Sequence, residues 1–567
     1  MRENGSAVAA ALDRGHTMSE LRNMSWEQFV EATGIEPRTI AVRLNGRRYA
    51  CLDVAYWDPE KKKPTHRRKT IGYYDESGEL ILTGSEKDTR KRTAPRPEVY
   101  ASIREIGQNL LFDSIADRIG LLKVVRDVFE SDSDAVLTCA YYLAGHSGSL
   151  CHCEQWSAGS ETPLDLRLAD QRISELLKRI TVDRRARFFR EWIANLGDDD
   201  NYALDITSIS SYSELIAMVR AGYNRDKEDL EQVNLALMVG SKSRLPAHYS
   251  IIPGNINDKT SLKRFLHTLK AYGFEKFSIV TDKGFFSKGN VDEMYRLKQR
   301  FVISIENGMN MSKGLIDGAR DEICNFDNYY DDGASQVYCI TRQDGWTCSD
   351  GTGHRCYFHI IFDPKKKEDD VHHFTEKLNL VRNGILKGDS AYASSPIAKK
   401  YFKVTGRDKK INISANQGLI EEKNAYSGFL IILSNHVKDS REALRIYRDK
   451  ETAESAFDDM KNGADFRRLR IHSESAMEGK AFLVFLSLII RLEMSNVMLK
   501  DQILRSKSRS EILEEMSLLR CTTIGGKNAI YTERTKLQKA VIKAFGIKTP
   551  FKDVLEETAS SPNTKHS

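Results

Sequence analysis

The sequence predicts an α/β protein of the α+β multidomain kind, built around a mixed β-sheet. Three observations support this fold class. The chain has 567 residues, which is too long for one hydrophobic core. After residue 200 the residue pattern becomes strand, strand, strand, helix, strand. Between residues 307 and 426 the pattern changes to short alternating runs that are rich in aromatic residues, Gly and Asp. We therefore expect several domains, one of which is interrupted by an insertion.

The first expected unit covers residues 1–97 and is a small basic β unit with a flexible, polar end over about residues 1–18. VRLNGRRYACLDVAYW alternates apolar and polar residues around Asn45 and Gly46, which predicts a hairpin. RRKTIGYYD would add a third strand. The densest basic cluster, KKKPTHRRK at 61–69, fits a phosphate-binding arm or, equally, a solvated hairpin with charged tips. Its candidate DNA-binding residues are Lys61, Lys62, Lys63, Arg67, Arg68 and Lys69.

Residues 98–198 form the second expected unit, a helical domain that we expect to bind DNA. A second basic run at 87–92 and a proline-containing linker near 93–97 precede it. The spacing of apolar residues then becomes helical, as in SIADRIGLLKVVRDVF and QRISELLKRITVDRRARFFREWIANL.

The catalytic core is expected at residues 199–306 and 427–500. Its first strands are NYALDITSIS, QVNLALMVG and LPAHYSIIPG, followed by a helix in TSLKRFLHTLKAYG and the strand FSIVTD. This order, with acids on the first and last strands, predicts a ribonuclease-H-like mixed sheet. A helix at about 287–298 and the strand RFVISIE follow.

The remaining elements interrupt or follow this core. Residues 307–426 are expected to be a β-rich insertion domain with a helix near 370–384. The core resumes with the strand GFLIILSN and a long apolar helix at about 476–500. AFLVFLSLII at 481–490 is only half a membrane span, so we expect a buried helix and no membrane contact. Residues 501–567 form a carboxyl-terminal region with a disordered tail from about 556.

Three carboxylates are the candidate catalytic and metal-binding residues. Asp205 lies in or just after a strand in NYALDITS, and Asp282 ends the strand in KFSIVTDKGF. Glu454 belongs to YRDKETAESAFDDMK, which has helical character. An α-helix advances about 100° per residue, so Tyr447, Lys450 and Lys461 should share one face with Glu454. That face would carry a carboxylate beside a phenol and two ammonium groups.

These residue types suit phosphodiester cleavage. The reaction needs an activated nucleophile, neutralised charge in the transition state and a stabilised leaving oxygen, and two bound cations supply all three. Mg²⁺ prefers carboxylate oxygens, so two Asp and one Glu are suitable ligands for a pair of Mg²⁺ ions, with Mn²⁺ as an expected substitute. Lys450 and Lys461 could pair with phosphates, and Tyr447 could stack on a base or contact a phosphate. Arg467, Arg468 and Arg470 follow in FRRLRIH and fit either DNA contact or a solvated loop.

Composition adds weaker constraints. Lys and Arg total 86 against 80 Asp and Glu, and a net charge of +6 decides nothing about nucleic acid in so long a chain. Nine cysteines at irregular spacing fit a reducing cytosol. Cysteines and histidines in the insertion lack a C-x2-C knuckle, which argues against zinc.

The residues around Glu454 resemble a known family. Tyr447, Lys450, Glu454 and Lys461 match the Y-x2-R-x3-E-x6-K motif of bacterial transposases of the insertion-sequence-four superfamily, with Lys in place of Arg. Asp205 in LDITS and Asp282 in TDKGF match the first two catalytic acids of that family. GYNRDKEDLEQVNLALMV, LPAHYSIIPGNINDKTSL, FRRLRIHSESAMEGKAFLVFLSLII and the amino-terminal AYWDPEKKKPTHRRKTIG are similar to the subgroup of insertion sequence 1634. The resemblance spans roughly residues 40–550.

This resemblance implies a DDE transposase that cleaves and joins DNA by two-metal phosphoryl transfer. The 172 positions between Asp282 and Glu454, against 77 between the two Asp residues, agree with an insertion before the Glu. Relatives bind the terminal inverted repeats and target DNA as a homodimer on paired ends, and they process the excised end through a hairpin. The implied location is the prokaryotic cytoplasm, at the nucleoid. Lys450 keeps the positive charge of the family Arg but lacks its bidentate fork, so weaker hairpin processing is expected.

Two other classes of function remain open at this stage. The chain could be a domesticated DNA-binding protein that no longer cuts, or another ribonuclease-H-like DNA nuclease. The presence of all three carboxylates argues against the first alternative. The cationic helix face and the long insertion argue against the second.

Overall fold

The computed structural model describes residues 2–44, 46–83, 101–146, 148–197, 201–274, 276–333, 335–406, 412–464, 466–471, 473–524 and 528–550. The chain divides into two compact units, Met1–Tyr100 and Ala101–Ser567. Asn45, the basic run at 87–92, the linker near 93–97 and the tail from 556 lie outside the described residues.

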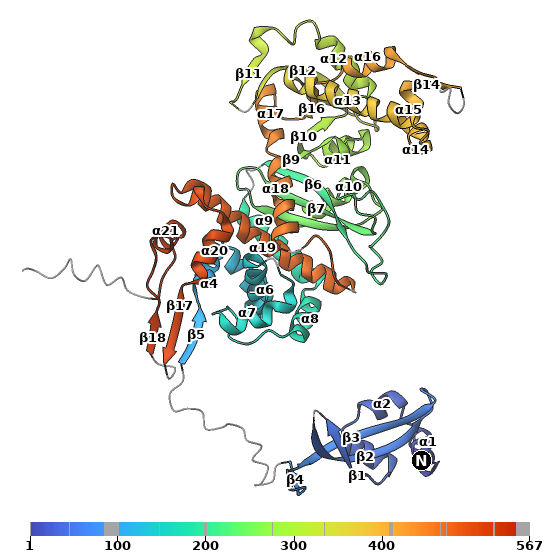
Figure 1. The fold of residues 1–567 in the computed structure, drawn as a ribbon, viewed down its shortest axis with the longest axis vertical. Coiled ribbons are helices and arrows are strands. Elements are labelled where there is room, and N and C mark those ends of the chain that lie inside the picture. The colour runs from blue at the N-terminus through green and yellow to red at the C-terminus, as the bar shows by residue number, and fades with distance from the viewer. Residues whose placement is uncertain are drawn as a thin grey trace, which may run out of the picture. The chain divides into compact units, whose positions relative to one another are not determined.

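The first unit is a four-stranded antiparallel sheet with helices against it (Figure 1). Its elements are α1 (Arg2–Asp13), α2 (Met18–Asn23), α3 (Trp26–Thr33), β1 (Arg38–Leu44), β2 (Arg47–Asp58), β3 (Lys63–Tyr74) and β4 (Leu80–Leu82). The hairpin and the third strand are as predicted. The expectation of a flexible amino-terminal end is wrong for α1. Its alanine-rich sequence favours a helix, and Val8 and Ala11 are buried in the same cluster as Val54 and Tyr56 of β2.

The core of the second unit is a nine-stranded sheet in the order β11-β12-β13-β16-β10-β9-β6-β7-β8. Five of its strands are β6 (Asn201–Ser210), β7 (Gln232–Gly240), β8 (Pro246–Pro253), β9 (Ser278–Thr281) and β10 (Arg300–Ile305). β6, β7 and β8 are antiparallel neighbours, whereas β9 lies parallel to both β6 and β10. Numbered in chain order, these strands run 3-2-1-4-5, which confirms the ribonuclease-H-like arrangement. The helices α10 (Asp258–Ala271) and α11 (Lys288–Arg296) connect them.

Strands of the inserted segment extend this same sheet. They are β11 (Tyr329–Asp331), β12 (Gln336–Thr347) and β13 (Gly353–Phe362), and β13 pairs with β16 (Phe429–Ser434), which pairs with β10. The segment is also richer in helix than predicted, with α12 (Asn310–Ala319), α13 (Pro364–Leu386), α14 (Ser390–Ser394), α15 (Pro396–Tyr401) and α16 (Gln417–Ala425). A small separate sheet joins β14 (Phe402–Thr405) to β15 (Asn412–Ala415). The helix expected near 370–384 is α13.

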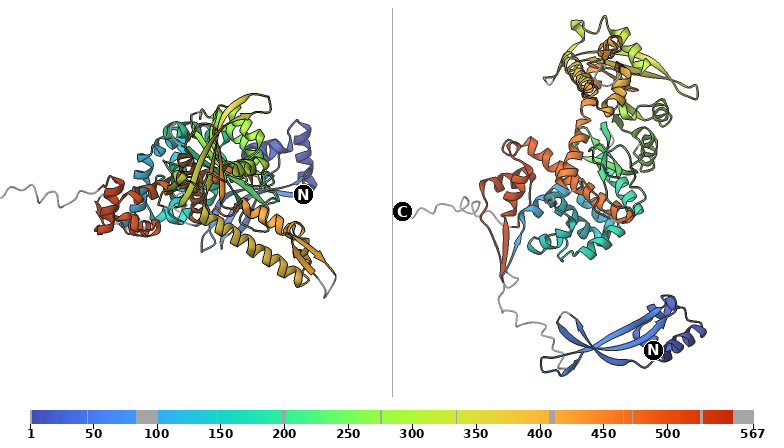
Figure 2. Two further views of the ribbon diagram at one scale, coloured as in Figure 1. Left: turned by 90° about the horizontal axis from the view of Figure 1, so that it is seen from above. Right: turned by 45° about the vertical axis from the view of Figure 1, so that its right-hand side comes forward.

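A helical layer packs against the long apolar helix α19 (Glu474–Lys500), as Figures 1 and 2 show. Its helices are α4 (Gly107–Arg118), α5 (Leu121–Phe129), α6 (Ser133–Gly145), α7 (Cys153–Gly159), α8 (Asp170–Arg179) and α9 (Val182–Leu196). α19 is long and apolar enough to cross a membrane, but most of that stretch is buried inside the protein. The prediction of a buried helix is therefore confirmed. One cluster of buried residues runs from Ile106 through the sheet and α19 to Ile547.

The carboxyl-terminal elements join this layer. α20 (Arg509–Ser517) and α21 (Lys536–Phe545) contact α4, and β5 (Ala101–Glu105) pairs with β17 (Arg520–Ile524), which pairs with β18 (Asn528–Tyr531). Before α19 the chain forms α17 (Ser440–Arg448), α18 (Glu451–Asp458) and a π-helical turn (Asp459–Gly463).

Candidate active site

Asp205 and Asp282 come together through the register of two parallel strands. β6 and β9 pair as Asn201 with Ser278 and as Ala203 with Val280, a constant offset of 77 residues. The same offset continued along both strands puts Asp205 level with Asp282. Because aligned residues of neighbouring strands lie side by side, Asp205 in the middle of β6 is next to Asp282 at the end of β9.

Asp205 is the more perturbed of the two acids. Burial and, to a lesser degree, the negative charge of Asp282 raise the pKa of Asp205 to about 6. The backbone N–H of Ile206, 2.8 Å from Asp205 Oδ1, and the cations Lys450 and Arg225 oppose this shift. A buried carboxylate beside a second carboxylate is short of positive charge, and a bound cation would relieve that deficit.

A third acid, which the sequence did not predict, approaches Asp282. Asp282 caps a short 3₁₀ turn (Lys283–Phe285), where its Oδ1 accepts a hydrogen bond from the N–H of Gly284 at 2.8 Å. A methyl group at Gly284 would lie 3.0 Å from Asp282 Oδ1 and 3.1 Å from Asp258 Oδ2. Asp258 therefore converges with Asp282 above Gly284. The only sequence signal was the cap residue Asn257, which marks Asp258 as the first residue of α10.

A hollow of about 360 Å³ opens beside these acids. Arg225 lines it and forms an ion pair with Asp258, so this cation is held next to the acidic edge of the sheet. Tyr223, Asn234 and Lys259 also line the hollow. Polar and cationic side chains thus surround the acids on the side of α10.

Glu454 reaches the site from α18 and pairs with a lysine. Lys450 Nζ lies 2.8 Å from Glu454 Oε1, with the lysine side chain 28 % exposed and the glutamate side chain 55 % exposed. Burial lowers the pKa of Lys450, but the hydrogen bond to Glu454 and the charge of Asp205 contribute to a net increase. Lys450 therefore interacts electrostatically with both Asp205 and Glu454, and its positive charge partly neutralises the site.

The single helix predicted from Tyr447 to Lys461 is wrong. The chain divides into α17 and α18 at Asp449 and Lys450, where the N–H of Lys450 bonds to Tyr447 three residues back instead of four. α17 packs on β10 and β13, whereas α18 packs on β6 and β7, so two contact surfaces set the directions of the two helices. Tyr447 is largely buried, and its hydroxyl donates to Ser304 Oγ at 3.0 Å.

Lys461 lies in the π-helical turn after α18, not in a regular helix. Its ammonium group is 2.7 Å from Asp226 Oδ2, and its side chain is only 10 % exposed. Asp226 belongs to the loop between β6 and β7. Lys461 thus joins this loop to the end of the helix that carries Glu454.

The donor set fits a divalent cation at the two aspartates. Among the described residues, no three Asp, Glu, His or Cys side chains form a compact ligand cluster. Asp205 and Asp282 nevertheless supply neighbouring oxygen ligands, and burial together with the charge of Asp282 raises the pKa of Asp205. Glu454 is engaged by Lys450, so it would join them only after that ion pair opens.

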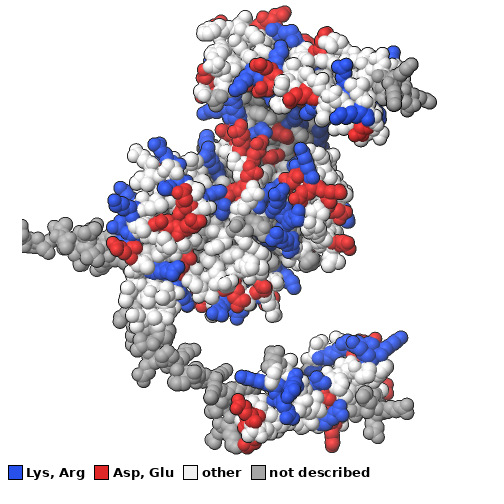
Figure 3. Space-filling view, viewed as in Figure 1, with Lys and Arg blue, Asp and Glu red and all other residues white. Residues whose placement is uncertain are grey.

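The arginines after the π-helical turn bind the same loop between β6 and β7. Arg467 and Arg468 both approach Glu228, at 3.6 and 3.4 Å, and Arg468 also lies over the ring of Tyr212. Arg470 has a left-handed backbone with φ of 48°. Figure 3 shows Lys and Arg interspersed with Asp and Glu on the viewed face, and no uniformly basic surface marks a DNA path there.

In the first unit, half of the candidate cations have structural partners. Arg67 donates to the carbonyl oxygens of Leu21 and Met24, Arg68 pairs with Asp53, and Lys69 pairs with Glu27. The exposed residues Lys61, Lys62 and Lys63 lie at and beside the β2–β3 hairpin turn. Of the six, these three are the best situated to meet a phosphate.

Comparison with known proteins identifies the segment that contains this site. A family model described as a transposase DDE domain matches residues 197–490. No curated protein matches the chain. Among solved structures, the chain is similar to a piggyBac transposase in a synaptic complex with hairpin DNA, with 10 % identity and a TM-score of 0.31. That alignment covers 80 % of this chain and 77 % of the other.

Proposed function

The chain belongs to the transposase DDE domain family, and from this premise we propose that it cleaves and joins DNA at the ends of a mobile element. The observation that carries the proposal is the register of β6 and β9, which brings Asp205 level with Asp282. Both acids and Glu454 fall inside the matched segment. We also propose the finer assignment to the insertion-sequence-four superfamily and the subgroup of insertion sequence 1634, which the motif around Glu454 supports.

In this proposal, Asp205 and Asp282 would hold a divalent cation, and Glu454 would complete the ligands of a pair. Mg²⁺ is the expected ion, and when bound it would activate the nucleophile and stabilise the leaving oxygen. Asp282 is oriented for this role by the N–H of Gly284. Asp205 is oriented by the N–H of Ile206.

Lys450 has a role in both states of the site. Without metal it neutralises Glu454 through a 2.8 Å ion pair and interacts with the charge of Asp205. If Glu454 served as a ligand of the cation, the ammonium group of Lys450 would lose its ion-pair partner and could hold a phosphate of the DNA strand. Tyr447, whose hydroxyl is bonded to Ser304, lies next to Lys450 and would border the same DNA strand.

We further propose double-stranded DNA as the partner, in the form of terminal inverted repeats and target DNA, with a homodimer acting on paired ends. The resemblance of the motifs to insertion-sequence transposases supports both points. The same resemblance supports a prokaryotic cytoplasmic protein that works at the nucleoid.

A cleavage assay tests the proposal directly. The purified protein is incubated with labelled DNA that carries the ends of the element, with and without Mg²⁺. We expect Mg²⁺-dependent nicking that is lost in Asp205→Asn, Asp282→Asn and Glu454→Gln, while binding of the same DNA persists. Glu442→Gln is the matched control, because it removes an exposed carboxylate from the preceding helix α17. Nicking that survives Asp205→Asn would contradict the proposed chemistry.

A further inference from the structure

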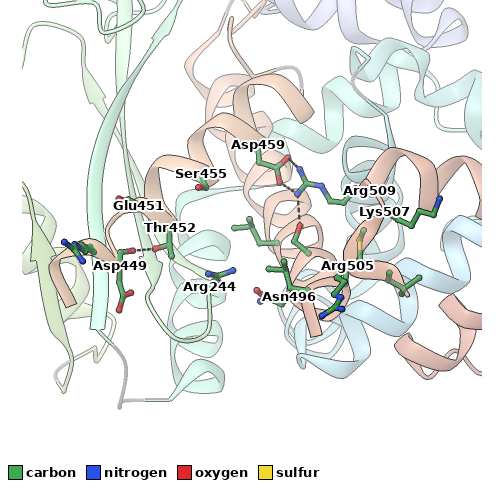
Figure 4. Close-up of a pocket in the computed structure, with 16 residues that line it drawn as sticks. Arg244, Asp449, Glu451, Thr452, Ser455, Asp459, Asn496, Arg505, Lys507 and Arg509 are labelled. Atoms are coloured by element: carbon green, nitrogen blue, oxygen red, sulfur yellow. Dashed lines mark hydrogen bonds and ion pairs between the residues drawn. The ribbon is translucent and has the colours of Figure 1, made fainter. Parts of the chain in front are cut away.

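A groove lies on the other side of α18 from the acids. It has a volume of about 560 Å³ and is bordered by α18, the carboxyl-terminal half of α19, the turn between β7 and β8, and the 3₁₀ turn Leu504–Ser506 (Figure 4). Thr452 and Ser455 of α18 line it. Around an α-helix Glu454 is about 160° from Thr452 and about 100° from Ser455, so the groove and Glu454 lie on different sides of α18. We call it the α18–α19 groove.

The groove has an apolar floor and a charged rim, in which five cations outnumber the three acids Asp449, Glu451 and Asp459. Leu492, Met498, Leu499 and Leu504 form the apolar part. The cations that line it are Arg244, Arg448, Arg505, Lys507 and Arg509. Such a lining suits a ligand with anionic groups on an apolar or sugar framework.

Three of the five cations already have acidic partners. Arg509 binds Asp459, Arg448 pairs with Asp332, and Lys507 pairs with Glu511 at 3.1 Å. Within the described ranges, Arg244 and Arg505 have no acidic partner, and both are exposed. These two guanidinium groups are therefore available to an incoming anion.

Arg244 is held at the rim by a constrained turn. Its φ of 55° is in the left-handed region, which residues with side chains seldom adopt. The turn is tied to α19, because Asn496 Nδ2 donates to the carbonyl oxygen of Ser243 at 2.9 Å. Figure 4 shows Arg244 and Arg505 on either side of Asn496. The two free arginines thus face the groove from separate elements.

We propose that the α18–α19 groove binds the sugar-phosphate backbone of one DNA strand next to the cleavage site. A guanidinium fork matches the geometry of a phosphate, and the apolar floor can pack against deoxyribose. The volume suits a short length of one strand, not a whole duplex. This inference rests on the proposed function, because it assigns the DNA path of that same site.

Salt-dependent DNA binding tests the inference. Each phosphate contact releases a counterion, so losing one contact lowers the slope of log K against log salt by about one. Binding of end-sequence DNA is measured by fluorescence anisotropy for Arg244→Gln and Arg505→Gln. For each variant we expect an affinity loss of roughly three- to tenfold at about 0.1 M salt and a slope reduced by about one. Arg382→Gln, on the exposed surface of α13, is the matched control and should change neither quantity.

One further variant and two further measurements, thermal unfolding and the binding of inorganic phosphate, separate the possible outcomes. Arg505→Lys keeps the charge and should restore the slope, and thermal unfolding shows whether each variant is folded. If the wild-type protein binds DNA and both Gln variants keep its affinity and salt slope, the groove assignment is wrong, but the proposed function is not affected. A wild-type protein that binds no DNA would overturn the proposed function together with this inference. If the two arginines are needed only for binding inorganic phosphate, the groove is a small-anion site and the inference is wrong.

Discussion

Replacing Asp459 with Asn tests whether a buried ion network holds the helix that carries Glu454. Asp459 begins the π-helical turn directly after α18, and its side chain is only 5 % exposed. Arg491 of α19 reaches Asp459 Oδ1 through Nε at 3.0 Å and Nη2 at 2.7 Å. Arg509 Nη2 donates to the same oxygen at 2.7 Å, and Arg491 Nη1 donates to the carbonyl oxygen of Ala144 at 2.7 Å. One carboxylate therefore links α18, α19, α20 and α6.

The expected loss of stability depends on how far Arg491 and Arg509 can be hydrated once Asp459 has lost its charge. Arg491 is 12 % exposed and cannot regain full hydration, whereas Arg509 is 27 % exposed and can regain part of it. Removing one partner from a buried ion pair costs about 3–5 kcal/mol. The second unit spans Ala101–Ser567, and a unit of this size has an unfolding entropy of about 1 kcal/mol per kelvin. If that unit unfolds as a whole, Tm should fall by about 3–5 °C.

The assay is thermal unfolding at pH 7.5, followed by circular dichroism and calorimetry. Asp458→Asn is the control, because Asp458 is exposed and adjacent, and it should change stability by less than about 0.5 kcal/mol. A Tm of Asp459→Asn within about 1 °C of the wild-type value would refute the reasoning. It would mean that Arg491 and Arg509 find other partners or water when Asp459 loses its charge.

Three further predictions concern other parts of the second unit. Gly479→Ala should lower Tm, because the added methyl group would overlap the carbonyl oxygen of Leu177 where α19 packs on α8. Gly318→Ala in α12, where an added methyl group would meet no atom within 4 Å, is the control and should not lower Tm. An unchanged Tm of Gly479→Ala would contradict the close packing. Burial lowers the pKa of His248 to about 3, so between pH 6.5 and about 3 the unfolded chain binds a proton that the folded chain does not. Wild-type stability should therefore fall as pH decreases over this window, by up to about 1.4 kcal/mol per unit, and unfolding in urea should show a smaller fall for His248→Phe. Lys450→Arg should raise the yield of hairpin ends in the cleavage assay, since Arg binds a phosphate through two hydrogen bonds, and an equal or lower yield would argue against that role.

Local sequence was enough to find the two aspartates and their surroundings. Apolar runs ending in an acid marked Asp205 and Asp282, and the order of strands and helices predicted that their strands lie side by side. In the structure β6 and β9 pair with a constant offset of 77 residues. Asp205 and Asp282 are also 77 positions apart, so they lie opposite each other. Glu454 was also located correctly, on a helix.

Other features depended on contacts between distant segments, which no local pattern reveals. The periodicity from Tyr447 to Lys461 is continuous, yet α17 and α18 separate because each packs on different strands. The approach of Asp258 to Asp282 depends on where α10 begins relative to β9. The insertion looked like a separate domain, but Cys356–Phe362 of β13 are buried without a break, as expected for a strand inside a sheet.

The sequence by itself determined the fold class and predicted the three carboxylates and the family motif, because strand ends, helix faces and residue spacing are properties of short stretches of chain. Only the tertiary structure decided which charges meet. It joins Lys461 to Asp226, it closes the network around Asp459, and it leaves two arginines of the α18–α19 groove without acidic partners among the described residues. These pairings join residues up to 235 positions apart, and their geometry arises only when the sheet, α18 and α19 pack together.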